Sequence, residues 1–226
     1  MDTVIEKQTD APLSADDSAA LIEKLARKAR AAQHVLAGMS DDAKADALRA
    51  AAASLRDHAA EILAANAKDI DAAKERGLSS AMIDRLKLDE DRLEGIAAAV
   101  ENVADLPDPV GQVIDRSERP NGLQFARVRV PVGVIGIIYE SRPNVTADAA
   151  TLCVRAGNAA LLRGGSEAVH SNRAINKALA EGLAKGGIPE GAVQLIPTQD
   201  RAAVGAMLKA AGLIDMIVPR GGKSLV

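Results

Sequence analysis

Residues that could bind a phosphorylated ligand follow three apolar segments of the chain. The first segment ends in Tyr139-Glu-Ser-Arg-Pro-Asn144, the second in Arg163-Gly-Gly and the third in Arg220-Gly-Gly. Glycines allow a phosphate to approach the backbone, free amides at a helix start donate hydrogen bonds to it, and arginine adds positive charge. The pattern predicts an anion or nucleotide site, although tight turns between strands and helices would show the same glycines without a ligand.

The elements that must position these residues alternate between strand and helix. Residues 132–139 carry Val and Ile without a charge, which predicts a strand buried on both faces. Asn144 is expected to cap the next helix through its side-chain oxygen, and Gly157, Gly186 and Gly212 are expected to end helices in the left-handed conformation. Such alternation predicts a parallel sheet with crossover helices, with ligands at its carboxyl edge. The expected strands and helices are 132–139, 145–156, 159–163, 166–185, 192–196, 201–211 and 214–218.

The amino-terminal part is predicted to be helical, because apolar residues recur there at helical spacing. Helix starts are expected near Ser14, Ser40, Ser79 or Ser80, and Asp89, with stops at Gly38 and Gly77 and a break near Asn66. Residues 111–115 and 123–130 resemble two strands, and Arg119-Pro-Asn-Gly122 between them contains the Asn-Gly pair that favours a tight turn, which predicts a hairpin. Three regions follow: helices in 1–109, a hairpin in 110–131 that packs on this chain or on a neighbouring subunit, and an α/β region in 132–226.

Composition excludes several classes of protein. A net charge of −3, with one Tyr, one Phe and no Trp in 226 residues, gives neither the basic surface nor the stacking aromatics of nucleic-acid binders. His34 and His58 have no second ligand at metal spacing, so no metal site is expected. The acidic amino-terminal stretch does not resemble a signal peptide, which predicts a cytoplasmic protein. Cys153, the single cysteine, is expected in the core rather than as a nucleophile, because no base lies nearby in the sequence.

Longer strings resemble the aldehyde dehydrogenase superfamily, and most closely its branch that reduces L-glutamyl 5-phosphate. They are ANAKDIDAAKERGLSSAMIDRL, LPDPVGQV, VPVGVIGIIYESRPNVTADAATLCVRAGNAALLRGGSEA, GIPEGAVQLI and IVPRGGKSL, in the family's order. The resemblance implies an aldehyde dehydrogenase-like α/β fold and NADPH as cofactor. It also implies reduction of the acyl phosphate to the semialdehyde, with release of phosphate, in proline biosynthesis. Finally, it implies a hairpin used in a homo-oligomer and an association with the upstream glutamate kinase.

The resemblance also assigns roles to residues. Asn144 matches the asparagine that helps to form the oxyanion hole, and such an amide stabilises a tetrahedral intermediate. Arg163 matches a position at the adenosine ribose, where an arginine suits a 2′-phosphate. Ser166 and Glu167 are alternatives for contacting the ribose. Charge and position alone, without the resemblance, make Ser141 and Arg142 candidates for the acyl phosphate. The remaining cofactor residues are Gly164, Gly165, Arg220, Gly221, Gly222 and Lys223.

One departure concerns the nucleophile. In this superfamily the catalytic cysteine follows the turn at Gly221 and Gly222, and this sequence stops at Val226. The chemistry needs a thiolate that forms a thioester, and Cys153 matches a non-catalytic position. The chain is therefore expected to be the cofactor-binding half of a reductase, without the catalytic domain and inactive on its own. The alternatives are a non-catalytic nucleotide-binding or assembly module with the same half-fold and, less favoured because no fixed period recurs, a helical repeat scaffold.

Overall fold

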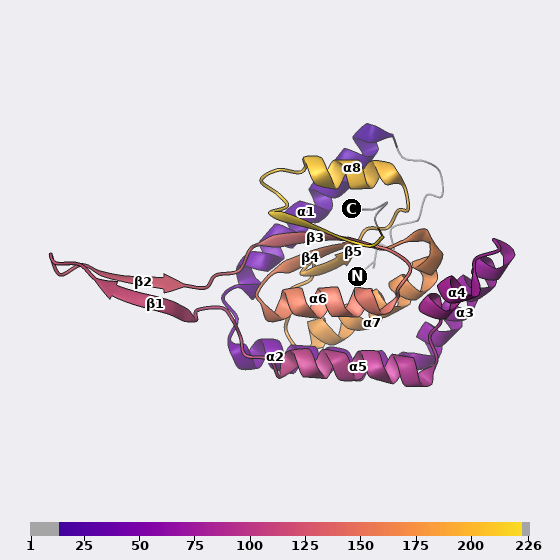
Figure 1. The fold of residues 1–226 in the computed structure, drawn as a ribbon, viewed down its shortest axis with the longest axis horizontal. Helices are drawn as coiled ribbons and strands as arrows, with labels where there is room; N and C mark the ends of the chain where they lie inside the picture. Colours follow the sequence, from indigo (N-terminus) through magenta and orange to yellow (C-terminus); the bar gives the residue numbers. More distant parts are fainter. Residues whose placement is uncertain (1–13, 223–226) are drawn as a thin grey trace, which may run out of the picture.

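A computed structural model describes residues 14–222 of the chain. Four parallel strands form a central sheet, and helices cover both of its faces (Figure 1). An antiparallel pair of strands, β1 and β2, projects from this body. The strands are β1 (Val113–Glu118), β2 (Gln124–Val128), β3 (Val134–Tyr139), β4 (Ala159–Arg163), β5 (Val193–Leu195) and β6 (Met216–Arg220). The helices are α1 (Ala15–Leu36), α2 (Asp41–Asp57), α3 (Ala59–Glu75), α4 (Ser80–Leu86), α5 (Glu90–Ala104), α6 (Asn144–Arg155), the short 3₁₀ helix η1 (Ser166–Ala168), α7 (Val169–Lys185) and α8 (Arg201–Lys209).

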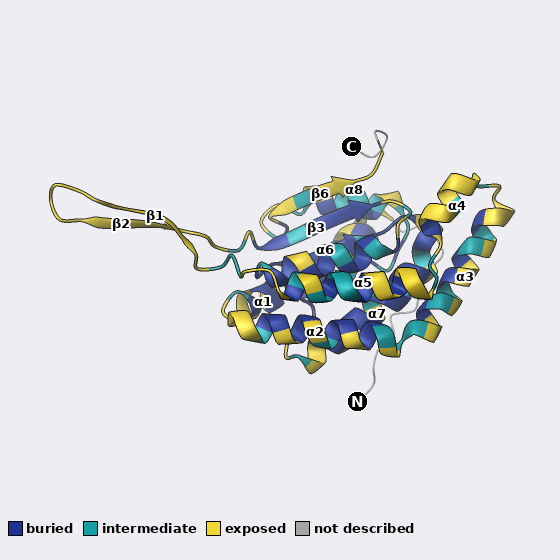
Figure 2. Ribbon diagram, turned by 60° about the horizontal axis from the view of Figure 1, so that its bottom comes forward, coloured by how far each residue is buried: buried dark blue, intermediate teal, exposed yellow. Residues whose placement is uncertain are grey.

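The apolar runs in β3 and β4 are buried on both faces, as the sequence predicted. Val134 and Ile138 pack with α1 and α8, whereas Ile137 and Tyr139 pack with α6 and α7. Helices α2 and α5 form a further layer outside α7 and α6 (Figure 2). Removing these side chains from water is the main stabilising contribution to the body.

The strand order creates a place for a ligand. The sheet has the order β5-β4-β3-β6, so the chain moves outward from β3 to β5 and then returns to the other side of β3. Such a reversal opens a crevice beyond the carboxyl ends of the strands. In this sheet that position is beyond the ends of β3 and β6, which pair Tyr139 with Arg220.

Side-chain caps begin several helices where the sequence predicted. The hydroxyls of Ser14, Ser40 and Ser79 and the carboxylate of Asp89 accept backbone hydrogen bonds at the starts of α1, α2, α4 and α5. These bonds satisfy amides that have no partner within the helix.

Two predicted helix boundaries are wrong. The break between α2 and α3 lies at His58 and not near Asn66. Asn66 stays helical because its buried side chain bonds to the carbonyl of Leu86, the amide of Leu88 and the hydroxyl of Ser171. The glycine cap of α7 also differs: Gly187 has φ +84°, while Gly186 remains at φ −82°.

The hairpin is formed, and its tight turn lies at the predicted residues Arg119 to Gly122. Pro120 and Asn121 occupy the centre of the turn, which is closed by a bond from the amide of Gly122 to the carbonyl of Arg119. Gly122 follows with φ +84°, the arrangement of a type I turn followed by a bulge. Every residue of β1 and β2 is exposed (Figure 2), so neither strand packs on the described part of this chain.

Candidate cofactor and active site

The carboxyl end of β3 joins the two Arg-Gly-Gly loops. The carboxylate of Glu140 accepts a hydrogen bond of 2.9 Å from the amide of Gly222, and the Glu140 amide donates to the carbonyl of Arg220. The loop after β4 lies on the other side of β3, because β4 pairs with β3. The two loops therefore flank the end of β3 at the switch point. Lys223 lies outside the described residues.

A buried polar network supports the first Arg-Gly-Gly loop. The hydroxyl of Tyr139 lies 2.8 Å from that of Thr146, which donates to Asn172. Burial raises the pKa of Tyr139 to about 12, although the hydrogen bond with Thr146 opposes this shift, so the phenol stays neutral. A Cβ on Gly164 would overlap Nδ2 of Asn172 and lie 3.1 Å from Cζ of Tyr139. The absence of a side chain at Gly164 thus serves packing, which the sequence did not predict.

Gly222 differs from Gly164 in its surroundings. Among residues 14–222, a Cβ added there would meet only the carboxylate oxygens of Glu140, at 3.7 and 3.9 Å. This is ordinary contact in open space. The second loop consequently leaves room beside its backbone, as close approach of a ligand requires.

Arg163 lies at the end of β4 with one fixed contact. Its Nη2 donates to the carbonyl of Gln199 at 2.7 Å. Its Nε and the side-chain oxygen of Gln199 are buried without a hydrogen-bond partner in the described part of the chain. Burial lowers the pKa of Arg163, and the nearby charge of Glu167 opposes this effect. Sequence reasoning missed Gln199, since nothing in its local pattern marks it.

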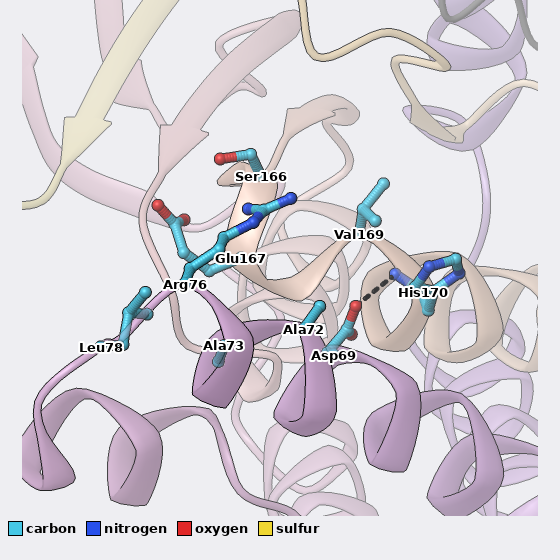
Figure 3. A pocket seen from close by; sticks show the side chains of 9 residues that line it. All are labelled: Asp69, Ala72, Ala73, Arg76, Leu78, Ser166, Glu167, Val169 and His170. Atoms are coloured by element: carbon cyan, nitrogen blue, oxygen red, sulfur yellow. Dashed lines mark hydrogen bonds between the residues drawn. The ribbon is translucent and has the colours of Figure 1, made fainter.

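Ser166 and Glu167 line a pocket between α3 and the start of α7 (Figure 3). Glu167 is half-buried and Ser166 is exposed. The side chain of Glu167 turns toward Gly165, because a Cβ on that glycine would lie 2.6 Å from a Glu167 carboxylate oxygen. On the α3 side the carboxylate of Asp69 accepts from the amides of His170 and Ser171 and so caps α7 from a distant part of the chain.

The structure corrects the predicted role of Asn144 as a helix cap. Pro143 occupies the cap position without a side-chain bond, and Asn144 is the first residue of α6. Nδ2 of Asn144 donates instead to Asp148, one turn later, at 2.9 Å. Asn144 lies close along the chain to Ser141 and Arg142, in the loop that connects β3 to α6.

Cys153 lies in the core, as predicted. Its side chain packs in the cluster that also holds residues of α5 and α7. Burial raises the pKa of Cys153 to about 12, so the thiol is protonated at neutral pH. Within residues 14–222 no group of His, Cys, Asp and Glu could hold a metal ion, and no helix there is long and apolar enough to cross a membrane.

Known proteins share this fold and sequence. The model of the aldehyde dehydrogenase family matches residues 7–225. The gamma-glutamyl phosphate reductase of Novosphingobium aromaticivorans is 70% identical over 212 residues, which are 94% of this chain and 50% of that protein. That of Rhizorhabdus wittichii is 62% identical over 225 residues, 100% of this chain and 52% of the relative. The crystal structure of gamma-glutamyl phosphate reductase from Thermotoga maritima superposes with a TM-score of 0.88 at 44% identity, over 90% of this chain and 49% of that one.

The chain thus spans about half the length of the curated relatives it matches. Its sheet, helices and hairpin are those of the aldehyde dehydrogenase fold, and its similarity to gamma-glutamyl phosphate reductases agrees with the branch expected from its motifs. On this evidence the chain belongs to the aldehyde dehydrogenase family.

Proposed function

We propose that this chain forms the cofactor-binding half of an NADPH-dependent reductase that converts L-glutamyl 5-phosphate to L-glutamate 5-semialdehyde in proline biosynthesis. The observation that carries the proposal is the meeting of both Arg-Gly-Gly loops and the start of α6 around the end of β3, at the switch point of the sheet. The names of the similar proteins support the choice of substrate. A cytoplasmic location stays a prediction from the sequence.

The residues at this edge fit a phosphorylated dinucleotide. Arg163 is a half-buried cation at the end of β4 whose Nε has no partner among the described residues, and no side chain of the described residues crowds Gly222. Arg163 would pair with a ribose 2′-phosphate, which favours NADPH over NADH. Glu167 turns toward Gly165, which makes it the better of the two candidates for the ribose hydroxyls, with Ser166 as the alternative. Gly164, Gly165 and the segment from Arg220 to Lys223 complete the proposed cofactor site.

The chain's own residues would bind and polarise the acyl phosphate. Asn144 donates a hydrogen bond to the acyl oxygen as negative charge develops on it. Ser141 and Arg142 contact the phosphate, which leaves as the anion. The nicotinamide cofactor, when bound, supplies the hydride that reduces the acyl carbon. The thiolate that this chemistry needs cannot come from Cys153, which is buried and protonated, so we propose that the chain alone does not turn over.

Calorimetry and an activity assay test the proposal together. NADPH titrated into the purified chain is expected to bind with one site per chain, while acyl phosphate and NADPH give no oxidation of the cofactor. A chimeric reductase, in which this chain replaces the half that it matches in the Novosphingobium aromaticivorans relative, is expected to be active. Turnover by the chain alone would contradict the proposal that this half binds the cofactor but lacks the nucleophile. A folded chain that binds no NADPH would contradict the cofactor role.

We further propose that the hairpin is a contact between subunits of a homo-oligomer; association with the glutamate kinase remains a prediction. The support is a set of exposed apolar side chains on a hairpin that projects from the body (Figure 1). Leu123 is 56% and Phe125 51% exposed, so replacing both with Asp is expected to shift the sedimentation of the chimeric reductase toward monomer. Val35→Asp is the matched control, since Val35 is 58% exposed on α1. An unchanged sedimentation coefficient in the hairpin variant would show that the hairpin is not the interface.

A further inference from the structure

The side-chain amide of Asn144 is held in one orientation by a neighbouring carboxylate. Asn144 and Asp148 are four residues apart on α6 and share a face of the helix. Nδ2 of Asn144 lies 2.9 Å from Oδ2 of Asp148. A carboxylate only accepts hydrogen bonds, so it faces the NH₂ group of the amide and repels the carbonyl oxygen. The flipped amide is thereby disfavoured.

The surroundings of Asp148 maintain this contact. Asp148 is half-buried, which raises the pKa of its carboxyl group, whereas the hydrogen bond from Asn144 and the charge of Arg220 on β6 oppose that shift. Arg220 belongs to the second Arg-Gly-Gly loop, so Asp148, which bonds to Asn144, is also within range of a charge of that loop. An acceptor in such partly desolvated surroundings makes a stronger hydrogen bond than one in water.

We propose that Asp148 is a positioning residue, which fixes the carboxamide of Asn144 so that its second N–H points at the acyl oxygen of the substrate. This inference rests on the proposed role of Asn144 as oxyanion donor. A side-chain amide has two N–H groups, and one bond to Asp148 leaves the other available. Without Asp148 the Asn144 amide can turn and present its oxygen to the acyl oxygen. The negative charge that develops there in the transition state then receives no hydrogen bond from Asn144.

A purely structural role gives different expectations. A carboxylate near the amino-terminal end of a helix also stabilises that helix through the helix dipole. Loss of this effect would lower the melting temperature and would act whether or not Asn144 is present. A positioning role acts only through Asn144 and changes kcat more than KM, since the negative charge on the acyl oxygen is absent from the bound substrate and develops on the way to the transition state.

A double-mutant cycle in the chimeric reductase separates these roles. Asn144→Ala is expected to lower kcat by about 10²- to 10³-fold. Asp148→Leu, which keeps the side-chain size without an acceptor, is expected to lower kcat by about 10- to 100-fold with little change in KM. Asp148→Asn, which keeps an acceptor oxygen, is the matched control and is expected to recover most of this loss. In the Asn144→Ala background Asp148→Leu is expected to have no further effect on kcat.

The outcomes are distinguishable. If Asn144→Ala leaves kcat unchanged, the proposed function of Asn144 fails and this inference fails with it. If Asn144→Ala lowers kcat but Asp148→Leu does not, or lowers it equally in both backgrounds, only the positioning role is overturned. Should Asp148→Leu not fold, NMR on the 226-residue chain with Asp148→Asn replaces it. A neutral amide oxygen is a weaker acceptor than a carboxylate, so the difference in chemical shift between the two Nδ2 protons of Asn144 is expected to become smaller. An unchanged difference would overturn the proposal.

Discussion

Replacing Gly164 with alanine is expected to destabilise the fold, whereas the same replacement at Gly222 is not. The new Cβ at Gly164 would overlap the amide of Asn172, which is 2% exposed and bonded to Thr146. The amide cannot move away without breaking that bond, and overpacking of this kind costs about 1–3 kcal/mol. For a chain of this size each kcal/mol lowers Tm by about 2–4 °C, so the expected loss is about 4–8 °C for about 2 kcal/mol.

The Gly222→Ala variant is the matched control. Its Cβ meets no atom of the described residues closer than 3.7 Å, so the expected change in unfolding free energy is within about 0.5 kcal/mol. Thermal unfolding followed by circular dichroism measures both variants beside the parent chain. Equal melting temperatures for all three would refute the conclusion that the Tyr139-Thr146-Asn172 network encloses Gly164.

Two further predictions concern buried polar groups and the single thiol. Asn66→Ala leaves the carbonyl of Leu86 and the amide of Leu88 without their partner and is expected to lower the unfolding free energy by about 2–4 kcal/mol; an unchanged urea midpoint would contradict this. Cys153, with its pKa raised to about 12 by burial, is a thiolate in only about one molecule in ten thousand at pH 8. Native protein is therefore expected to react with a thiol reagent far more slowly than unfolded protein, and equal rates would show that Cys153 is accessible.

Much of the fold could be predicted because its signals are local. The uncharged run in β3, the strand and helix alternation after it and the serine caps of α1 and α2 each follow from neighbouring residues. The continuity of α3 through Asn66 could not be predicted, because tertiary hydrogen bonds hold this residue inside the helix, where its residue type favours a break.

Part of the candidate site could also be predicted, because some of its residues form local motifs. The Arg-Gly-Gly strings and Asn144 stand out as short motifs, and parallel strands bring their ends to one edge of the sheet. Asp69, which caps α7 from about a hundred residues away in the chain, and Gln199, which holds Arg163 through its backbone, contribute through contacts that no local pattern encodes. The packing role of Gly164 also depends on a residue from another element, Asn172.

The most direct test of the cofactor-binding claim is the affinity of the chain and its Arg163→Ala variant for NADPH and for NADH. Arg163 keeps one donor on Gln199 and has a buried Nε free of partners among the described residues, and a charged hydrogen bond is worth about 1.5–3 kcal/mol. The variant is thus expected to bind NADPH about 10- to 100-fold more weakly and NADH with a much smaller loss, because NADH lacks the 2′-phosphate. The affinity of Arg163→Lys for NADPH is expected to lie between those of the parent chain and Arg163→Ala, since lysine keeps the charge without the planar guanidinium. Equal losses for NADPH and NADH would contradict the claim and would make Arg163 a structural residue of the turn.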